Sequence, residues 1–151
     1  MVTETTKAGP RDRVTQFAIF TPNRLGRLND LVRLLAAQTV HVLALTVVDT
    51  TDSAIIRMVV DDPDGARQIL AREGFPFTET SLLVVEVTPA DLPSLMSALL
   101  EVEVNVNYLY SFIPHPDGKP LVGLSLEDND LAEQALRRHQ FRTLRQSDLS
   151  R

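Results

Sequence analysis

The segment Thr21-Pro22-Asn23-Arg24-Leu25-Gly26-Arg27-Leu28 joins an apolar run that ends at Phe20 to an amphipathic segment that continues to about Gln38. Glycine allows a tight backbone turn and leaves the first amides of a following helix uncovered. The segment therefore predicts a strand-to-helix turn at which a carboxylate would dock. The same residues are also typical of a turn that only caps a helix. Repetition of the surrounding pattern later in the chain adds support to the binding role.

The residues around this turn predict the order strand, helix, strand, strand, helix, strand. Branched and aromatic residues predict strands at 14–20, 40–48 and 53–60, and a fourth extended piece that ends near residue 80. A second helix opens at the acidic residues Asp61, Asp62 and Asp64, whose carboxylates are better explained as partners of free amides than as a metal site. The first helix is predicted by apolar residues that recur every three or four positions: Leu25, Leu28, Leu31, Val32 and Leu35.

The second half of the chain repeats this pattern. A shift of 64 places residues 40–45 on residues 104–109. A longer hairpin loop at residues 114–120 raises the shift to 66, so that Ala66 meets Ala132 and Phe75 meets Phe141. A repeat of this length is a domain duplication. We therefore expect an α+β protein with a disordered tail at residues 1–13 and two modules at residues 14–80 and 81–148.

Composition limits the classes of function. The chain has 151 residues, of which 44% are hydrophobic, and a net charge of −5. This charge argues against nucleic acid as a partner, because nucleic-acid-binding proteins carry basic surfaces. No run reaches the ~18 apolar residues of a membrane span, and the absence of cysteine fits a reducing compartment. We expect a cytoplasmic protein without a membrane partner.

The sequence contains no recognisable catalytic or metal-binding constellation. His41, His115 and His139 fall in a predicted strand, loop and helix without the spacing of zinc ligands. Nothing resembles a nucleophile elbow or a phosphate-binding loop. We therefore expect a non-enzymatic protein with no catalytic residues, no metal and no cofactor.

The predicted strands are apolar on both of their faces, as residues 17–20, 43–48 and 82–85 show. Two crossover helices in each module cover only one face of a four-stranded antiparallel sheet. A large exposed apolar face is uncommon in a monomer. We expect another sheet, from the sister module or from a second chain, to cover this face, and we predict a homodimer.

Two motifs resemble those of the ACT family, whose small regulatory modules bind amino acids. Residues 23–28 resemble the family's Asn/Asp-Arg-Pro-Gly-x-Leu turn, and Val104-Asn105-Val106 resembles its Val/Ile-Asn-Val/Ile strand start. The resemblance covers residues 14–148. It implies two tandem ferredoxin-like modules, each with the order βαββαβ and with their antiparallel sheets side by side.

The two copies depart from the motifs in different ways. In the first copy, Leu25 replaces the usual proline of the turn and His41 replaces the strand-start asparagine. In the second copy, the turn has Val87 at the polar position and Ala90 in place of glycine, but the asparagine is kept as Asn105. Each copy alone is therefore half of a site.

The resemblance implies an amino acid held between adjacent modules, by the turn of one and the strand start of the other. Asn23 and Asn105 would meet across the module boundary, since an amide both donates and accepts hydrogen bonds, and Arg24 or Arg27 would attract the carboxylate. Tyr108 and Tyr110 share one face of a strand and would either stack on a ligand or pack in the sheet. The predicted ligand residues are Asn23, Arg24, Leu25, Gly26, Arg27, Leu28, Asn105 and Tyr108.

Two functions are compatible with this resemblance. The first is a free-standing sensor that binds an amino acid and presents a changed surface to a partner through allostery. The second is a regulatory subunit of an amino-acid biosynthetic enzyme, as the small subunit of acetolactate synthase is. Those subunits have one module followed by a different domain, whereas both halves of this chain look alike.

Overall fold

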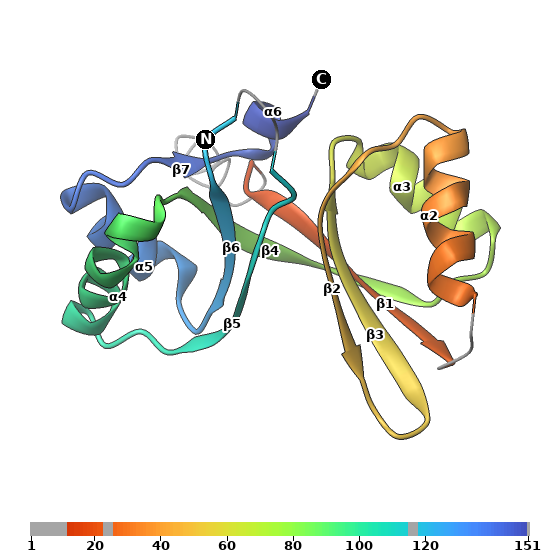
Figure 1. Cartoon of the computed structure of the whole chain (residues 1–151), viewed down its shortest axis with the longest axis horizontal. Helices are drawn as coiled ribbons and strands as arrows, with labels where there is room; N and C mark the ends of the chain where they lie inside the picture. Colours follow the sequence, from red (N-terminus) through yellow and green to blue (C-terminus); the bar gives the residue numbers. More distant parts are fainter. Residues whose placement is uncertain (1–11, 23–25, 115–117, 151) are drawn as a thin grey trace, which may run out of the picture. The chain divides into compact units, whose positions relative to one another are not determined.

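The computed structural model describes residues 12–22, 26–114 and 118–150 (Figure 1). Its contacts divide the chain into two compact units. The first module holds Thr15–Thr80 together with the described residues from Leu149 onward. The second module holds Ser81–Asp148 together with the described residues as far as Val14.

The first module has the order βαββαβ. Its sheet is antiparallel and has the strand order β2-β3-β1-β4 (Figure 1). The elements are β1 (Val14–Pro22), α2 (Arg27–Ala37), β2 (Val42–Asp49), β3 (Ser53–Val60), α3 (Pro63–Arg72) and the first part of β4 (Phe77–Glu86).

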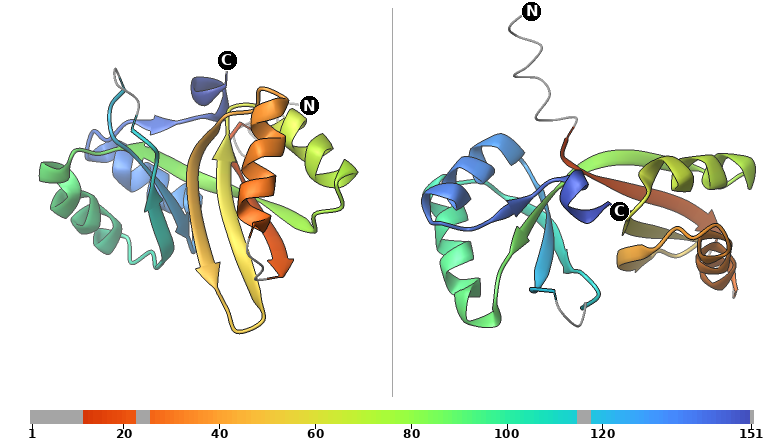
Figure 2. Two further views of the ribbon diagram at one scale, coloured as in Figure 1. Left: turned by 45° about the vertical axis from the view of Figure 1, so that its right-hand side comes forward. Right: turned by 90° about the horizontal axis from the view of Figure 1, so that it is seen from above.

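The core of the first module lies between one face of this sheet and the helices α2 and α3 (Figure 2). Phe17 is paired with Met58 and Ile19 with Ile56, so alternate residues of two strands point to the same side. Leu31 and Leu35 of α2 are buried against them. The apolar side chains of α2, which recur every three to four residues, therefore pack on the sheet face formed by every second strand residue, as the sequence pattern predicts.

The second module repeats this arrangement with the strand order β7-β4-β6-β5. Its core combines Leu83 and Val85 of β4 with Leu95 and Leu99 of α4, the first α-helix of this module. The elements are the end of β4, the 3₁₀ turn η1 (Pro89–Asp91), α4 (Leu92–Glu101), β5 (Val106–Ser111), β6 (Leu121–Leu126), α5 (Asn129–Arg138), β7 (Thr143–Leu144) and α6 (Gln146–Leu149).

The two modules match at the level of single residues. Asp62 and Asp128 cap α3 and α5 by accepting hydrogen bonds from the amides of Gly65 and Leu131, at 3.1 and 3.0 Å. The pairing register of β2 shifts at residues 42–44, and that of β5 shifts at the equivalent residues 106–108. Two tandem modules of ferredoxin-like order are thus confirmed.

One strand serves both modules. β4 runs from Phe77 to Glu86 without a break, whereas sequence analysis ends a strand near Thr80. No glycine, proline or asparagine separates Thr80 from the apolar residue Leu82, so nothing in the local sequence interrupts the extended backbone. The last strand of one copy and the first strand of the next are therefore continuous.

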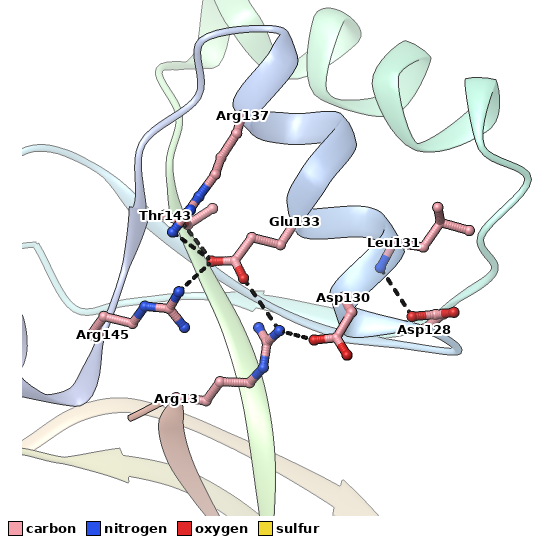
Figure 3. A network of polar contacts seen from close by, with 8 residues as sticks. All are labelled: Arg13, Asp128, Asp130, Leu131, Glu133, Arg137, Thr143 and Arg145. Carbon is pink, nitrogen blue, oxygen red and sulfur yellow. Dashed lines mark hydrogen bonds and ion pairs between the residues drawn. The ribbon is translucent and has the colours of Figure 1, made fainter. Parts of the chain in front are cut away.

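Arg13 belongs to the fold, although sequence analysis assigns it to a tail. Its side chain is 7% exposed and pairs with Asp130 and Glu133 of α5 (Figure 3). A guanidinium group that is buried to this degree needs carboxylate partners, because the loss of hydration is otherwise costly. The rest of the expected tail, residues 1–11, lies outside the described residues.

The helices α2, α3, α4 and α5 all end in the same backbone motif. The second residue after each helix end has a positive φ: 57° at Thr39, 75° at Gly74, 54° at Glu103 and 66° at Gln140. The next amide then returns to a carbonyl of the last turn, as from Val40 to Leu35 at 2.9 Å and from Phe141 to Leu136 at 2.9 Å. This is the Schellman motif, for which glycine is the preferred residue.

We expect Glu103→Gly to raise the free energy of unfolding by about 1 kcal/mol, because glycine has no Cβ to oppose a φ of 54°. Urea denaturation followed by circular dichroism measures the change. Gly74→Ala, at the end of α3, is the matched control and should lower stability by a similar amount. A stability of E103G equal to that of the wild type would contradict this explanation.

Candidate functional site

The predicted turn opens α2 at Gly26. Its φ of 93° is left-handed, and its carbonyl accepts a hydrogen bond from the amide of Asp30 at 2.8 Å. No described side chain caps α2, whereas aspartates cap α3 and α5. The start of α2 thus retains amides for which the described chain supplies no side-chain acceptor. Asn23, Arg24 and Leu25 lie outside the described residues.

The second copy builds this turn differently. Pro89, Ala90 and Asp91 form a 3₁₀ turn before α4, and Thr88 Oγ1 donates a hydrogen bond to Asp91 Oδ2 at 3.0 Å. Alanine opposes the left-handed conformation that Gly26 adopts, because its Cβ clashes with the backbone. The loss of the turn glycine therefore has a visible consequence in the backbone.

The two strand-start residues also differ in their surroundings. Their backbone contacts are equivalent, because the carbonyl of His41 accepts from the amide of Asp61 and that of Asn105 accepts from Glu127. The side chains are not equivalent. Nδ1 of His41 forms a hydrogen bond with Oδ2 of Asp61 at 2.7 Å. The exposed side-chain amide of Asn105, in contrast, has no hydrogen-bond partner within the described chain.

Arg27 lies beside a hollow of about 430 Å³ on the first module. Its guanidinium carbon is 4.4 Å from the centre of the Phe75 ring, a cation–π contact. The hollow combines two basic and two acidic side chains with three apolar ones. The residues that line it are Arg27, Asp30, Arg33, Leu34, Ala37, Glu73 and Phe75.

Two other predicted site residues make packing contacts. Leu28 packs against the core of the first module. The rings of Tyr108 and Tyr110 are stacked, with centroids 6.4 Å apart and an angle of 22° between their planes. Of the predicted residues that are described, Gly26, Arg27 and Leu28 belong to the first module, and Asn105 and Tyr108 belong to the second.

The hollow beside α2 is not among the sites predicted from the sequence. Residues 27, 30, 34 and 37 recur at helical spacing, and this signal places them on one face of α2. The remaining wall comes from Glu73 and Phe75 beyond the end of α3. No periodicity connects those two residues to α2, so only the fold brings them together.

Within residues 12–22, 26–114 and 118–150, no group of three or more histidine, aspartate or glutamate side chains is arranged to hold a metal ion. None of the helices in that part of the chain combines the length and apolarity needed to cross a membrane.

Solved structures resemble this one over most of its length. Protein BT0572 from Bacteroides thetaiotaomicron is 26% identical, with a TM-score of 0.81 over 91% of this chain and 96% of that one. The regulatory subunits of aspartate kinase from Thermus thermophilus, in its ligand-free form, and from Thermus flavus are 16% and 18% identical. Their TM-scores are 0.60 and 0.55, over 85% of this chain and 92% of each of theirs. At this identity the likeness concerns the fold.

Sequence comparison identifies the family. Curated protein sequences give no match to the chain. A family model described as an ACT domain pair matches residues 13–150, which include both modules. The duplicated βαββαβ order and the glycine turn before α2 agree with that match. The chain therefore belongs to the ACT domain pair family.

Proposed function

We propose that the protein is a non-enzymatic regulatory protein that binds an amino acid. The observation that carries this proposal is the exposed side-chain amide of Asn105, which has no partner within the described chain. In the other copy, the equivalent His41 is held by Asp61 at 2.7 Å. An exposed amide that both donates and accepts suits a ligand with an ammonium and a carboxylate group.

The turn before α2 supplies the second half of the proposed site. The carboxylate of the amino acid binds the start of α2, where backbone amides and the helix dipole favour an anion. Arg24 or Arg27 adds positive charge. The side chains of Asn23 and Asn105 act on the same ligand, and Leu25, Gly26, Leu28 and Tyr108 complete the set carried over from the ACT motifs.

Isothermal titration calorimetry with each standard amino acid tests this function. For the amino acid that binds, we expect Asn23→Ala and Asn105→Ala each to weaken binding about tenfold. The reason is that a hydrogen bond to a charged group contributes about 1.5 kcal/mol. Binding of no standard amino acid would contradict the proposed function.

The chain offers matched controls for both variants. Asn107 is exposed on the same strand as Tyr108, and Asn29 lies on α2 next to the turn, so N107A and N29A should bind like the wild type. Arg33→Ala removes a charge from the hollow beside α2. An affinity lowered by R33A but unchanged by N105A would place the ligand in that hollow and overturn the proposed site.

A second candidate is a regulatory subunit of an amino-acid biosynthetic enzyme. It is favoured by the fold similarity to aspartate kinase regulatory subunits, because this chain covers 92% of the length of each. Those chains are therefore similar in length to the two modules of this chain. Affinity purification from the source cells distinguishes the two functions, since a subunit brings a large enzyme with it and a free-standing sensor does not.

We also propose that two chains form a homodimer. Phe20 pairs with Ile55, and Ile55 pairs with Val48, so the three side chains form a row across three strands. The row lies on the sheet face opposite the core residues Ile19 and Ile56, and Phe20 and Val48 are 40% and 39% exposed. A second sheet that covered this row would remove apolar surface from water. Light scattering should give twice the mass of one chain.

A further inference from the structure

Each module contains an ion pair between its second helix and the segment that follows it. In the first module, Arg67 of α3 binds Glu79 of β4 through two parallel hydrogen bonds. Nε donates to Oε2 and Nη2 donates to Oε1, both at 2.7 Å. A bidentate pair of this kind has a well-defined geometry as well as a favourable charge.

The environment of the first pair agrees with this geometry. Arg67 also donates from Nη1 to Asp64 at 2.7 Å. The hydrogen bonds from Arg67 hold the pKa of Glu79 below its usual value, and those to Glu79 and Asp64 raise the pKa of Arg67. Both groups are therefore charged at neutral pH, and the helix side of the pair is positive.

The second module has the opposite polarity at the same positions. The shift of 66 carries Arg67 to Glu133 of α5 and Glu79 to Arg145. Arg145 Nη2 lies 3.4 Å from Glu133 Oε2, and Thr143 Oγ1 donates to the same oxygen at 2.9 Å (Figure 3). Arg13 and Arg137 add positive charge around Glu133, at 3.2 and 3.3 Å. Here the helix residue of the pair, Glu133, is the negative partner.

The helices that carry the two pairs are equivalent, whereas Glu79 lies within β4 and Arg145 directly follows the shorter strand β7. α3 and α5 both have ten residues, and their starts at Pro63 and Asn129 differ by the same shift of 66. An aspartate caps each helix at the equivalent position. The segment that follows the second helix of either copy would therefore meet a similar helix if it docked on the wrong module.

Wrong docking would place like charges together. Arg145 would face Arg67, and Glu79 would face Glu133. Like charges that are brought into contact disfavour an assembly, and misassembly of similar domains is a characteristic failure of repeated proteins. We propose that the inverted ion pairs direct the segment after the second helix of each module to its own helix, within one chain and between two copies of it.

The test is to give the first module the polarity of the second. The variant D64N/R67E/E79R keeps an ion pair between α3 and β4, and the Asp64→Asn change prevents a new repulsion on the helix. After unfolding in urea and rapid dilution, size-exclusion chromatography with light scattering measures the fraction of non-native assemblies. We expect this fraction to rise at least about threefold over that of D64N, since two unfavourable contacts are lost.

A conservative variant separates polarity from pair strength. D64N/R67K/E79D weakens the bidentate geometry but keeps the helix side positive. It should refold with the same fraction of non-native assemblies as D64N. An unchanged fraction in D64N/R67E/E79R, or an equal rise in both variants, would overturn the proposal. The urea midpoint of each native variant is measured in parallel, and a rise that simply follows a lowered midpoint would also count against it.

Discussion

Replacing Glu133 by alanine is expected to lower the free energy of unfolding by about 3 kcal/mol. The side chain of Glu133 is only 10% exposed and lies among Arg13, Arg137, Thr143 and Arg145 (Figure 3). Its removal leaves several positive charges close together. Among the described residues, Arg13 would keep only Asp130 as a carboxylate partner, and Asp130 is largely exposed to solvent.

Most of the expected loss of stability in E133A comes from Arg13. Its Nη1 atom already has no hydrogen-bond partner within the described chain. A buried charge without its partner loses hydration and gains little in return, which is why breaking a buried pair costs more than the pair contributes. The effect should therefore exceed that of an exposed ion pair several-fold.

Chemical denaturation of three variants measures this effect. Arg137→Ala removes an exposed neighbour of Glu133 and should cost less than about 1 kcal/mol. Glu133→Gln keeps an acceptor for Thr143 but removes the charge, so its stability should lie between those of E133A and the wild type. A loss in E133A no larger than that in R137A would show that the cluster around Glu133 is not an important source of stability.

Leu99→Ala is expected to lower the free energy of unfolding by a similar amount, about 3 kcal/mol. Leu99 is 2% exposed and belongs to the core cluster of the second module. Truncation removes apolar contacts and leaves a cavity, since neighbours on α4, α5 and the sheet relax only in part. Leu35→Ala, at the equivalent position of the first module, should have an effect of the same size.

The adjacent residue provides the control. Leu100 follows Leu99 on α4 but is 76% exposed, so Leu100→Ala should change stability by less than about 0.5 kcal/mol. Urea denaturation compares the two variants in the same helix and with the same chemical change. Similar losses in L99A and L100A would contradict the assignment of Leu99 to a packed core.

Local patterns account for the part of the fold that could be predicted. β3 spans Ser53–Val60, the range predicted from its branched residues. Asp62 caps α3, as its place at the start of the predicted second helix indicates. Strand alternation, helical spacing and caps depend on residues only a few positions apart, so they can be read from the sequence alone.

Features that depend on distant residues were missed. Arg13 and Glu133 are separated by the whole first copy and most of the second, and no local pattern connects them. The unbroken course of β4 was also missed, because the repeat suggested two strands where the chain forms one. The left-handed residues Thr39 and Glu103 carry no glycine signal, since packing after the helix imposes their conformation.

The amino-acid sequence by itself determined the duplication, the βαββαβ order and the turn at Gly26, because these depend on spacing along the chain. Only the tertiary structure decided that Asp61 forms a hydrogen bond with the side chain of His41, whereas the side-chain amide of Asn105 has no hydrogen-bond partner in the described chain. The physical reason is that a hydrogen bond needs its partner within about 3 Å. Residues 41 and 61 reach that distance only after β2 and β3 have paired.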